Sequence, residues 1–331
     1  MARIFMDGFE SGNLNWWVVS ETFVDSSSPP AGFSGSYYLR VHDANWTAYT
    51  TLNSSKAELY FAFKYMLRIA GTPSGIISFY DSAGTVIGGL YRESATGLPT
   101  FRLGGGGAAI QATGTTVINT FTVYLIEIRY KPLNSGGILQ LKINGAAMEI
   151  NFSGDSTAGL ENIIKFGWFH TIVSTACCID DFVVDDANWI GNTKIQALVP
   201  TGAGATTGWT PSTGDNYAAV DEKPALDTDY IKTGSSQIDT YAMQNLSGSI
   251  ASIKSVAVQS RNWRTGNGSY DRGQHIVRPA STDGLSASKT SIFPITATSF
   301  QSIWELNPED SAAWEEADVN GMEAGIKAVT A

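Results

Sequence analysis

Cysteine and histidine are scarce in this sequence. The only cysteines of the 331-residue chain, Cys177 and Cys178, are adjacent, so they can neither join distant strands nor provide the spaced ligands of a zinc site. We expect two reduced thiols, partly buried on a strand. The three histidines, His42, His170 and His275, have no Gly-x-Ser-x-Gly or cysteine partner pattern. The sequence therefore gives no support to serine or cysteine hydrolysis.

Charge and long apolar runs are also scarce. Charged residues make up 16% of the chain, and 31 acidic against 21 basic residues leave a net charge of −10. Nucleic acids and anionic membrane surfaces are bound by clustered Lys and Arg. No apolar run approaches the ~18 residues of a membrane span. We therefore expect neither nucleic acid nor a membrane as a partner.

Glycine and aromatic residues are abundant instead. The chain has 34 Gly, 15 Phe, 13 Tyr and 9 Trp, and 43% of its residues are hydrophobic. Aromatic and β-branched residues suit a pleated, half-buried surface. The length is that of about two domains. Composition therefore favours an all-β protein with two domains.

Alternation and turn signals predict a series of strands through residues 1–190. Within Glu58–Ile69 apolar side chains recur at every second position, as in a strand with one buried face. Asp81–Gly84 and Asn144-Gly145 each separate two apolar runs, and the second is a strong hairpin signal. Gly104–Gly107 precedes no helix pattern, so we expect a loop rather than a phosphate-binding turn.

The run Ile179–Val184 is predicted to be the last strand of this domain, and a short joint, Asp186–Asn192, follows it. Asp180-Asp181 heads the strand, the chain opens with an apolar strand ending in Asp7-Gly-Phe-Glu10, and the Asn-Gly hairpin reads Leu141-Lys-Ile-Asn-Gly145. These features resemble concanavalin A-like (laminin G-like) jelly rolls. The resemblance implies that the last strand lies beside the first, so Ile179–Val184 should pair near Arg3–Phe9.

Residues 191–331 restart the strand pattern. We expect a strand at Lys194–Val199 and a Gly/Thr loop at Pro200–Gly208. The further predicted strands are Asn216–Val220, Tyr230–Lys232, Ile238–Met243, Ile253–Trp263, Gln274–Arg278 and Phe300–Glu305. Pro308 then suits the first turn of a helix, whose apolar stripe would be Trp314, Ala317, Met322 and Ile326.

The predicted fold class is therefore all-β. A concanavalin A-like jelly-roll sandwich occupies residues 1–190, and a smaller β-sandwich with a short C-terminal helix occupies residues 191–331.

Spaced elements of the second half resemble, in the same order, a module of tailed-phage structural proteins that commonly follows a laminin G-like domain. They are Ile195–Val199, Gly208-Trp-Thr-Pro211, Asp221-Glu222, Asp227–Ile231 and the end from Trp304 to Gly325. The resemblance implies a non-enzymatic virion component with other virion proteins as partners. It would be displayed on the tail, as a minor tail or fibre-associated protein, or on the capsid as a decoration protein. Because Met1–Glu10 has no apolar signal-peptide core, we expect synthesis in the host cytoplasm without a signal.

A glycanase is the enzyme class that a jelly roll most invites. Glucanases on this fold carry Glu-x-Asp-x-x-Glu, and retaining catalysis places two carboxylates about 5–5.5 Å apart. The nearest match is Glu149-Ile-Asn-Phe, with Asn151 at the middle position and no second glutamate; Glu127 stands alone on an apolar strand. We therefore predict that the protein is not an enzyme and requires no cofactor.

A calcium site is the alternative chemistry that the jelly-roll resemblance implies. Hard cations bind clustered oxygen ligands, and Asp7, Asp180 and Asp181 would converge if the first and last strands pair, with Asp43 as a fourth ligand. In the alternative reading, the aspartate pair only starts a strand and accepts backbone hydrogen bonds.

Exposed aromatic side chains would allow carbohydrate binding without catalysis. Trp16, Trp17, Trp46 and Tyr49 lie on or beside predicted loops, where their rings could stack on sugars. A sandwich core uses aromatic residues as well, and the sequence does not separate the two uses. The alternative function is thus an adhesin that attaches the particle to host-surface glycans.

Self-association is expected from the scarcity of charge and the many strand edges. Edge strands need covering, and virion proteins act in symmetric copies. We predict a homo-oligomer, with a trimer as the first expectation. Trp304, Trp314 and Met322, near the predicted helix, are the candidate docking residues; burial inside their own domain is the alternative.

Overall fold

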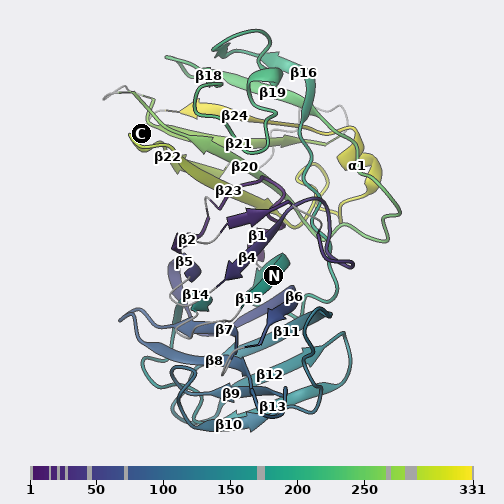
Figure 1. Ribbon diagram of the computed structural model, residues 1–331. Coiled ribbons are helices and arrows are strands. Elements are labelled where there is room, and N and C mark those ends of the chain that lie inside the picture. The colour runs from purple at the N-terminus through teal and green to yellow at the C-terminus, as the bar shows by residue number, and fades with distance from the viewer. Residues whose placement is uncertain are drawn as a thin grey trace. The chain divides into compact units, whose positions relative to one another are not determined.

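The structure is a computed structural model, and it describes residues 3–14, 16–20, 23–26, 29–42, 47–70, 74–169, 176–265, 270–279 and 289–329. The chain divides into two compact units (Figure 1). The first unit comprises residues 1–195 and the second residues 196–331. Within the described ranges, no helix has the length and apolar character needed to cross a membrane.

The first unit is a sandwich of two antiparallel sheets. The first sheet has the order β13 (Met148–Gly154), β12 (Gly137–Ile143), β11 (Val123–Lys131), β6 (Leu59–Ile69), β15 (Ala176–Asp185), β4 (Tyr38–His42) and β3 (Phe23–Asp25), and β1 (Arg3–Asp7) also pairs with β15. The second sheet has the order β10 (Ile110–Thr113), β9 (Pro99–Arg102), β8 (Val86–Arg92), β7 (Ser74–Tyr80), β14 (Ile163–Phe169), β5 (Thr47–Lys56) and β2 (Val18–Ser20). The predicted jelly-roll sandwich is confirmed.

The first and last strands of this unit are neighbours, as predicted. In β1 and β15, Arg3 lies opposite Asp185 and Asp7 opposite Phe182. The predicted hairpin at Asn144-Gly145 joins β12 to β13, and both residues have positive φ angles, 54° and 69°. Positive φ angles at both central residues are what a type I′ turn requires.

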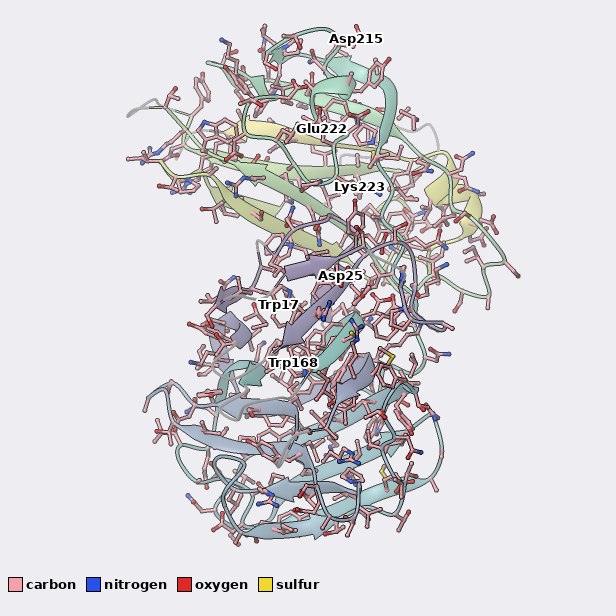
Figure 2. All side chains as sticks on the ribbon, in the orientation of Figure 1. Trp17, Asp25, Trp168, Asp215, Glu222 and Lys223 are labelled. Carbon is pink, nitrogen blue, oxygen red and sulfur yellow. The ribbon has the colours of Figure 1, made fainter. Side chains whose placement is uncertain are left out.

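Aromatic rings fill the space between the two sheets. Phe182 of β15 contacts Trp17, Phe63 and Trp168 at centroid distances of 5.2 to 5.4 Å. Trp17 and Trp168, labelled in Figure 2, also contact each other at 5.5 Å. Such pairs add about 0.5–1.5 kcal/mol each beyond the area they bury. The aromatic content of the sequence is therefore used largely as core.

The two adjacent cysteines are thiols outside any disulfide, and they lie in the buried strand β15. Burial raises the pKa of the Cys178 thiol to about 12 and that of Cys177 well above its usual value. Because the thiolate is the reactive form, both side chains are chemically inert in the folded protein.

The second unit also consists of strands. Its main sheet has the order β16 (Pro200–Thr207), β19 (Ile238–Met243), β24 (Glu323–Val329), β21 (Arg272–Arg278) and β22 (Lys289–Ile292). Two further pairs are β17 (Thr210–Pro211) with β18 (Ile231–Lys232), and β20 (Val256–Asn262) with β23 (Thr298–Trp304). A 3₁₀ turn, η1 (Tyr217–Ala219), and one helix, α1 (Glu316–Asn320), complete the described elements.

Several local predictions for this unit are wrong. Lys194–Val199 is not a strand, whereas the predicted loop at Pro200–Gly208 is the edge strand β16, whose side chains alternate between half-buried and exposed. Asn216–Val220 contains the turn η1 rather than a strand. The predicted helical stripe is also split, because α1 ends at Asn320 and Ile326 belongs to β24, between β19 and β21.

Candidate functional site

The outer face of the first sheet carries polar side chains on β11 and β12. Alternate residues of β12 enter the core, so Gln140 and Lys142 point the other way. In register, Lys142 lies directly opposite Glu127 of β11. Glu127 is only 4% exposed, which is unusual for a carboxylate on an outer sheet face. Another part of the chain therefore covers it.

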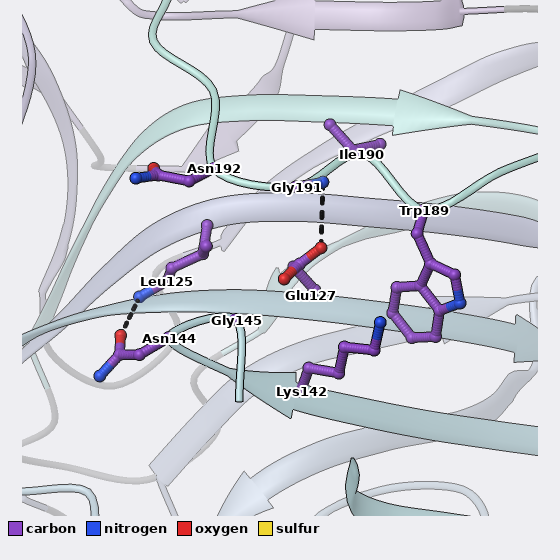
Figure 3. A pocket seen from close by; sticks show the side chains of 9 residues that line it. All are labelled: Leu125, Glu127, Lys142, Asn144, Gly145, Trp189, Ile190, Gly191 and Asn192. Carbon is purple, nitrogen blue, oxygen red and sulfur yellow. Dashed lines mark hydrogen bonds between the residues drawn. The ribbon is translucent and has the colours of Figure 1, made fainter. Parts of the chain in front are cut away.

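The cover is the joint segment, which we define as residues 186–195. The Gly191 N–H donates a hydrogen bond to Oε1 of Glu127 at 3.0 Å, as drawn in Figure 3. The Ile195 N–H donates to Oδ1 of Asp181 at 2.7 Å. The joint segment is thus hydrogen-bonded to the first sheet.

Trp189 is the aromatic residue of the joint segment. Its ring lies 4.1 Å from Nζ of Lys142, a close cation–π contact (Figure 3). The ring of Tyr60 lies 5.8 Å from the Trp189 ring. Two neighbours on the sheet therefore fix the orientation of the half-buried indole.

An open pocket of about 510 Å³ lies between the joint segment and the sheet. It is lined by Leu125, Glu127, Lys142, Asn144, Gly145, Trp189, Ile190, Gly191 and Asn192. Oδ1 of Asn144 accepts a hydrogen bond from the Leu125 N–H at 2.9 Å, which fixes this carboxamide. Figure 3 shows the carboxamides of Asn144 and Asn192 on one side of the pocket and Trp189 on the other. The pocket therefore combines an aromatic ring with amide and charged groups, which suits a polar ligand with an apolar face.

The three aspartates predicted to bind calcium do not form one cluster. Asp7 accepts hydrogen bonds from the Trp17 indole and the Phe9 N–H, at 2.9 and 2.7 Å. Burial raises its pKa to about 6, although those two hydrogen bonds lower it. Asp180 and Asp181 have other partners. No group of three or more metal-binding side chains occurs among the residues that the structure describes, and Asp43 lies outside them.

Asp180 and Asp181 hold a buried network instead. Asp180 accepts hydrogen bonds from the N–H groups of Ser34 and Asp181, at 2.6 and 2.7 Å. Asp181 accepts from the Ser34 hydroxyl at 2.5 Å and forms an ion pair with Lys64 at 2.8 Å. Burial and the neighbouring Asp181 carboxylate raise the pKa of Asp180. The alternative reading of the sequence, in which the pair accepts hydrogen bonds, describes these contacts. Calcium binding stays a prediction.

The four aromatic residues predicted to bind carbohydrate do not form one surface. Trp17 is a core residue, 5% exposed, and Trp16 packs against that core. Trp46 lies outside the described residues. Tyr49 lies on the outer face of the second sheet, in contact with Lys165. The sequence analysis missed Trp189, although a tryptophan in a short joint is itself a signal that the joint packs against something.

The structure corrects the prediction of the three docking residues. Trp304, Trp314 and Met322 are between 3% and 5% exposed and form part of the core of the second unit. The Trp314 indole donates a hydrogen bond to the Trp304 carbonyl at 3.0 Å. Burial within their own unit, the alternative that the sequence left open, is what the structure has, because both rings are needed to fill a small core.

Glu149, the nearest match to a glycanase carboxylate, has a structural role. It lies on the edge strand β13 and accepts hydrogen bonds from the N–H groups of Thr115 and Thr116, at 2.9 and 3.0 Å. Partial burial alone would raise its pKa, but these bonds and those from the two threonine hydroxyls lower it. A carboxyl held ionised in this way is a poor general acid.

A buried histidine lies inside the second unit. Nε2 of His275 is 2.5 Å from Oγ of Ser260, and Nδ1 is 2.9 Å from Oγ of Ser302. The ring is 2% exposed, and burial lowers its pKa to about 4. A hydroxyl, and not a carboxylate, faces Nδ1, so the group that stabilises an imidazolium in hydrolytic triads is replaced by a neutral one. These residues form a neutral polar network within the core.

No family model matches the chain, and no curated protein matches its sequence. Many solved structures match part of the chain. An endo-β-1,4-glucuronan lyase from Trichoderma reesei is 12% identical, with a TM-score of 0.43, over 56% of this chain and 96% of its own. A carbohydrate-binding module from Bacillus subtilis is 11% identical, with a TM-score of 0.33, over 52% and 97%.

A Bacillus subtilis protein of unknown function with a galectin-like fold is 12% identical, with a TM-score of 0.38, over 58% of this chain and 98% of its own. These neighbours are β-sandwiches, and several are carbohydrate-binding modules or galectin-like domains. At such identities and TM-scores, the likeness carries no argument about what this chain does.

Proposed function

We propose that this chain is a non-catalytic carbohydrate-binding protein and that the pocket beside Trp189 holds a sugar unit. The observation that carries the proposal is the arrangement of an oriented indole opposite two carboxamides in an open pocket of about 510 Å³. Sugars present an apolar ring face and hydroxyl groups around the edge. An aromatic ring and amide groups are complementary to these two features.

The rigidity of the pocket supports the proposal. Lys142 holds the Trp189 ring at 4.1 Å, and Glu127 holds the backbone of the joint segment through Gly191. Asn144 is held by the backbone of Leu125. Each side chain fixed before binding reduces the entropy cost of association, about 0.5–1.5 kcal/mol per side chain. Weak polar contacts with a sugar therefore give a higher net affinity here than they would in a pocket with flexible side chains.

The proposal is for binding without cleavage. Glu127 accepts a hydrogen bond from the joint segment, and Glu149 accepts hydrogen bonds from the two threonines. Retaining or inverting hydrolysis needs two carboxyl groups with separate roles across one glycosidic bond. The contacts of these two glutamates support structural roles for both of them.

Two asparagines of the joint segment provide a matched test. Asn192 lines the pocket and Asn188 does not, and both are exposed. On a panel of immobilised glycans, Asn192→Ala should weaken the best-bound glycan about two- to tenfold, the size of one hydrogen bond of about 0.5–1.5 kcal/mol. Asn188→Ala should leave binding unchanged. Trp189→Ala should reduce it more than Asn192→Ala, because the ring is lost.

Equal binding by Asn188→Ala, Asn192→Ala and Trp189→Ala would refute the assignment of the pocket. Release of shortened oligosaccharides from any bound glycan, lost in Glu149→Gln, would refute the non-catalytic part.

We further propose that the protein is a component of a tailed-phage particle. The support is the sequence resemblance of the second half, in particular Gly208-Trp-Thr-Pro211 and the spaced end from Trp304 to Gly325. Antibodies against the purified protein should label intact particles in electron microscopy, and the position of the label separates tail from capsid. Particles without label, and without the protein in their mass spectrum, would refute this part and leave the glycan-binding part standing.

A further inference from the structure

The pocket beside Trp189 has a row of polar side chains next to it, on the outer face of the first sheet. Asn151 of β13, Gln140 of β12 and Arg129 of β11 are neighbours in register across three strands. Lys142, which lines the pocket, is two residues from Gln140 on the same face of β12, a spacing of about 6.5 Å along the strand. The row therefore adjoins the pocket and ends at the edge strand β13.

The hydrogen bonds within the row fix the orientation of each amide. Arg129 can only donate, and its Nη1 atom is 3.4 Å from Oε1 of Gln140. The amide nitrogen of Gln140 therefore faces Asn151, and it donates to Oδ1 of Asn151 at 2.8 Å. The carbonyl oxygen of each amide is thus used inside the row, and the exposed Asn151 has its nitrogen Nδ2 left at the outer end.

The pocket has the same polarity as the row. Oδ1 of Asn144 accepts from the Leu125 N–H, so the donor end of this carboxamide is left for a ligand. Lys142 adds an ammonium with three N–H donors, and the Trp189 ring lies against one side of it at 4.1 Å (Figure 3). Across the described ranges, Lys142 forms no ion pair or hydrogen bond, and Nδ2 of Asn144 and of Asn151 has no acceptor.

The two carboxylates of this region already accept hydrogen bonds. Oε1 of Glu58 accepts from Nε of Arg129 at 2.7 Å and from the Tyr60 hydroxyl at 2.8 Å. Glu127 is 4% exposed and accepts from the backbone of the joint segment. A ligand on this face therefore meets mainly hydrogen-bond donors.

We propose that the ligand is an acidic glycan, a chain of uronic acid units, with one carboxylate bound by Lys142 and a neighbouring unit along Gln140 and Asn151. The inference rests on the proposed function and deepens it, because it names the charge of the sugar and extends the site beyond the pocket. A carboxylate only accepts hydrogen bonds, so it complements a surface of donors better than a hydroxyl, which brings a donor of its own. The net charge of −10 disfavours a dense polyanion such as a nucleic acid.

The test compares polymers that differ in charge. Polygalacturonate and hyaluronan are each compared with their own methyl ester, which keeps the chain and neutralises the carboxylates. In affinity electrophoresis at low salt, at least one of the two acidic polymers should retard the wild-type protein. Its ester should bind at least about tenfold more weakly, because hydrogen bonds to a charged group are the stronger kind.

Two substitutions change the charge of the site itself. Lys142→Gln should weaken binding of the acidic polymer at least about tenfold, because the charged donor is lost. Asn151→Asp keeps the oxygen that accepts from Gln140 and replaces the outward donor with an acceptor, so it should weaken binding at least about fivefold. Lys232→Gln, in the second unit, and Asn53→Asp, on β5 of the other sheet, make the same charge changes at exposed positions and should bind as wild type. Unchanged melting temperatures show that the variants are folded.

Three results would overturn the inference: no retardation by either acidic polymer, equal binding of an acidic polymer and its ester, or equal binding by Asn151→Asp and Asn53→Asp. Poly(U) bound as tightly as the acidic polymer, with the same dependence on Lys142, would overturn it in favour of nucleic acid.

The failure of this inference can be told apart from the failure of the proposed function. A neutral glycan whose binding needs Trp189 and Asn192, with no preference for an acidic polymer, would overturn the inference and leave the proposed function standing. Binding of the acidic polymer that needs Lys142 and Asn151 but is unchanged in Trp189→Ala would support the inference and refute the assignment of the pocket.

Discussion

Replacing Asp181 with Asn tests the buried network that anchors the joint segment. Asp181 is 1% exposed and accepts from the Ser34 hydroxyl, the Ile195 N–H and the ammonium of Lys64, which is 16% exposed. Its φ angle is 49°, in the left-handed region. Asn tolerates that backbone as well as Asp does, so the substitution removes charge with little change of shape or strain.

The expected loss follows from the partners. Breaking a buried ion pair costs about 3–5 kcal/mol, since the remaining charge stays buried. Lys64 retains the Ser34 hydroxyl at 3.0 Å, and Asp180 can ionise more easily once its charged neighbour is gone. A net loss of about 2–3 kcal/mol is therefore expected. For a unit of this size it lowers the melting temperature by about 4–12 °C.

Calorimetry measures this loss, with Asp186→Asn as the matched control. Asp186 pairs with Lys56 at 3.0 Å, but both side chains are a quarter or more exposed, so its loss should cost about 0–1 kcal/mol. A loss in Asp181→Asn no larger than in Asp186→Asn would refute the reasoning.

The pH dependence gives a second measure of the same network. The pKa of Asp180 is raised in the folded state to about 8, so the folded protein holds a proton that the unfolded chain has already released. The contribution of Asp180 to the free energy of unfolding is complete below about pH 4 and is lost as the pH rises toward 8. The slope should be smaller in Asp181→Asn, because one cause of the raised pKa is gone.

Three further predictions concern the metal, the histidine and assembly. Asp7, Asp180 and Asp181 already accept hydrogen bonds, so 1 mM Ca²⁺ should move the melting temperature by less than about 1 °C; a rise reversed by chelator would support the calcium site by linkage. The pKa of His275 falls to about 4 on burial, so the second unit should lose stability as the pH falls from about 6.5 to 4, by up to about 3 kcal/mol. His275→Gln should flatten that dependence, and an unchanged slope in calorimetry would contradict it. Light scattering should find a homo-oligomer, with a trimer first, since edge strands such as β13 and β16 need covering; a monomer at all concentrations would contradict this prediction.

Much of the first unit could be predicted from local patterns. The period-two run in β6 and the Asn144-Gly145 turn depend on neighbouring residues only, and both specify their structure strongly. The pairing of β1 with β15 is not local, and it came from resemblance to a known fold. In the second unit β16 carries Gly, Ala and Thr rather than large apolar residues, so its alternation gave no hydrophobic signal.

The candidate site could not be predicted, because its parts lie far apart in the sequence. Glu127 looked like an isolated charge on an apolar strand, and its role depends on Gly191 folding back over β11. The role of Trp189 in the site depends on its contact with Lys142 of β12. Trp17, in contrast, looked accessible because it follows a turn, yet its indole is drawn inward by Asp7. Exposure is a property of the assembled sheets, and local sequence does not carry it.

The inert thiols of β15 provide a built-in reporter of how the first unit opens. Cys177 and Cys178 are fully buried at the centre of the sheet, between β6 and β4, and no other cysteine competes for a label. A thiol reagent can therefore react only with molecules in which β15 has separated from its neighbours. Where reclosing is faster than labelling, the labelling rate gives the opening free energy of this strand. The native sequence thus allows the stability of one strand to be followed without any engineered probe.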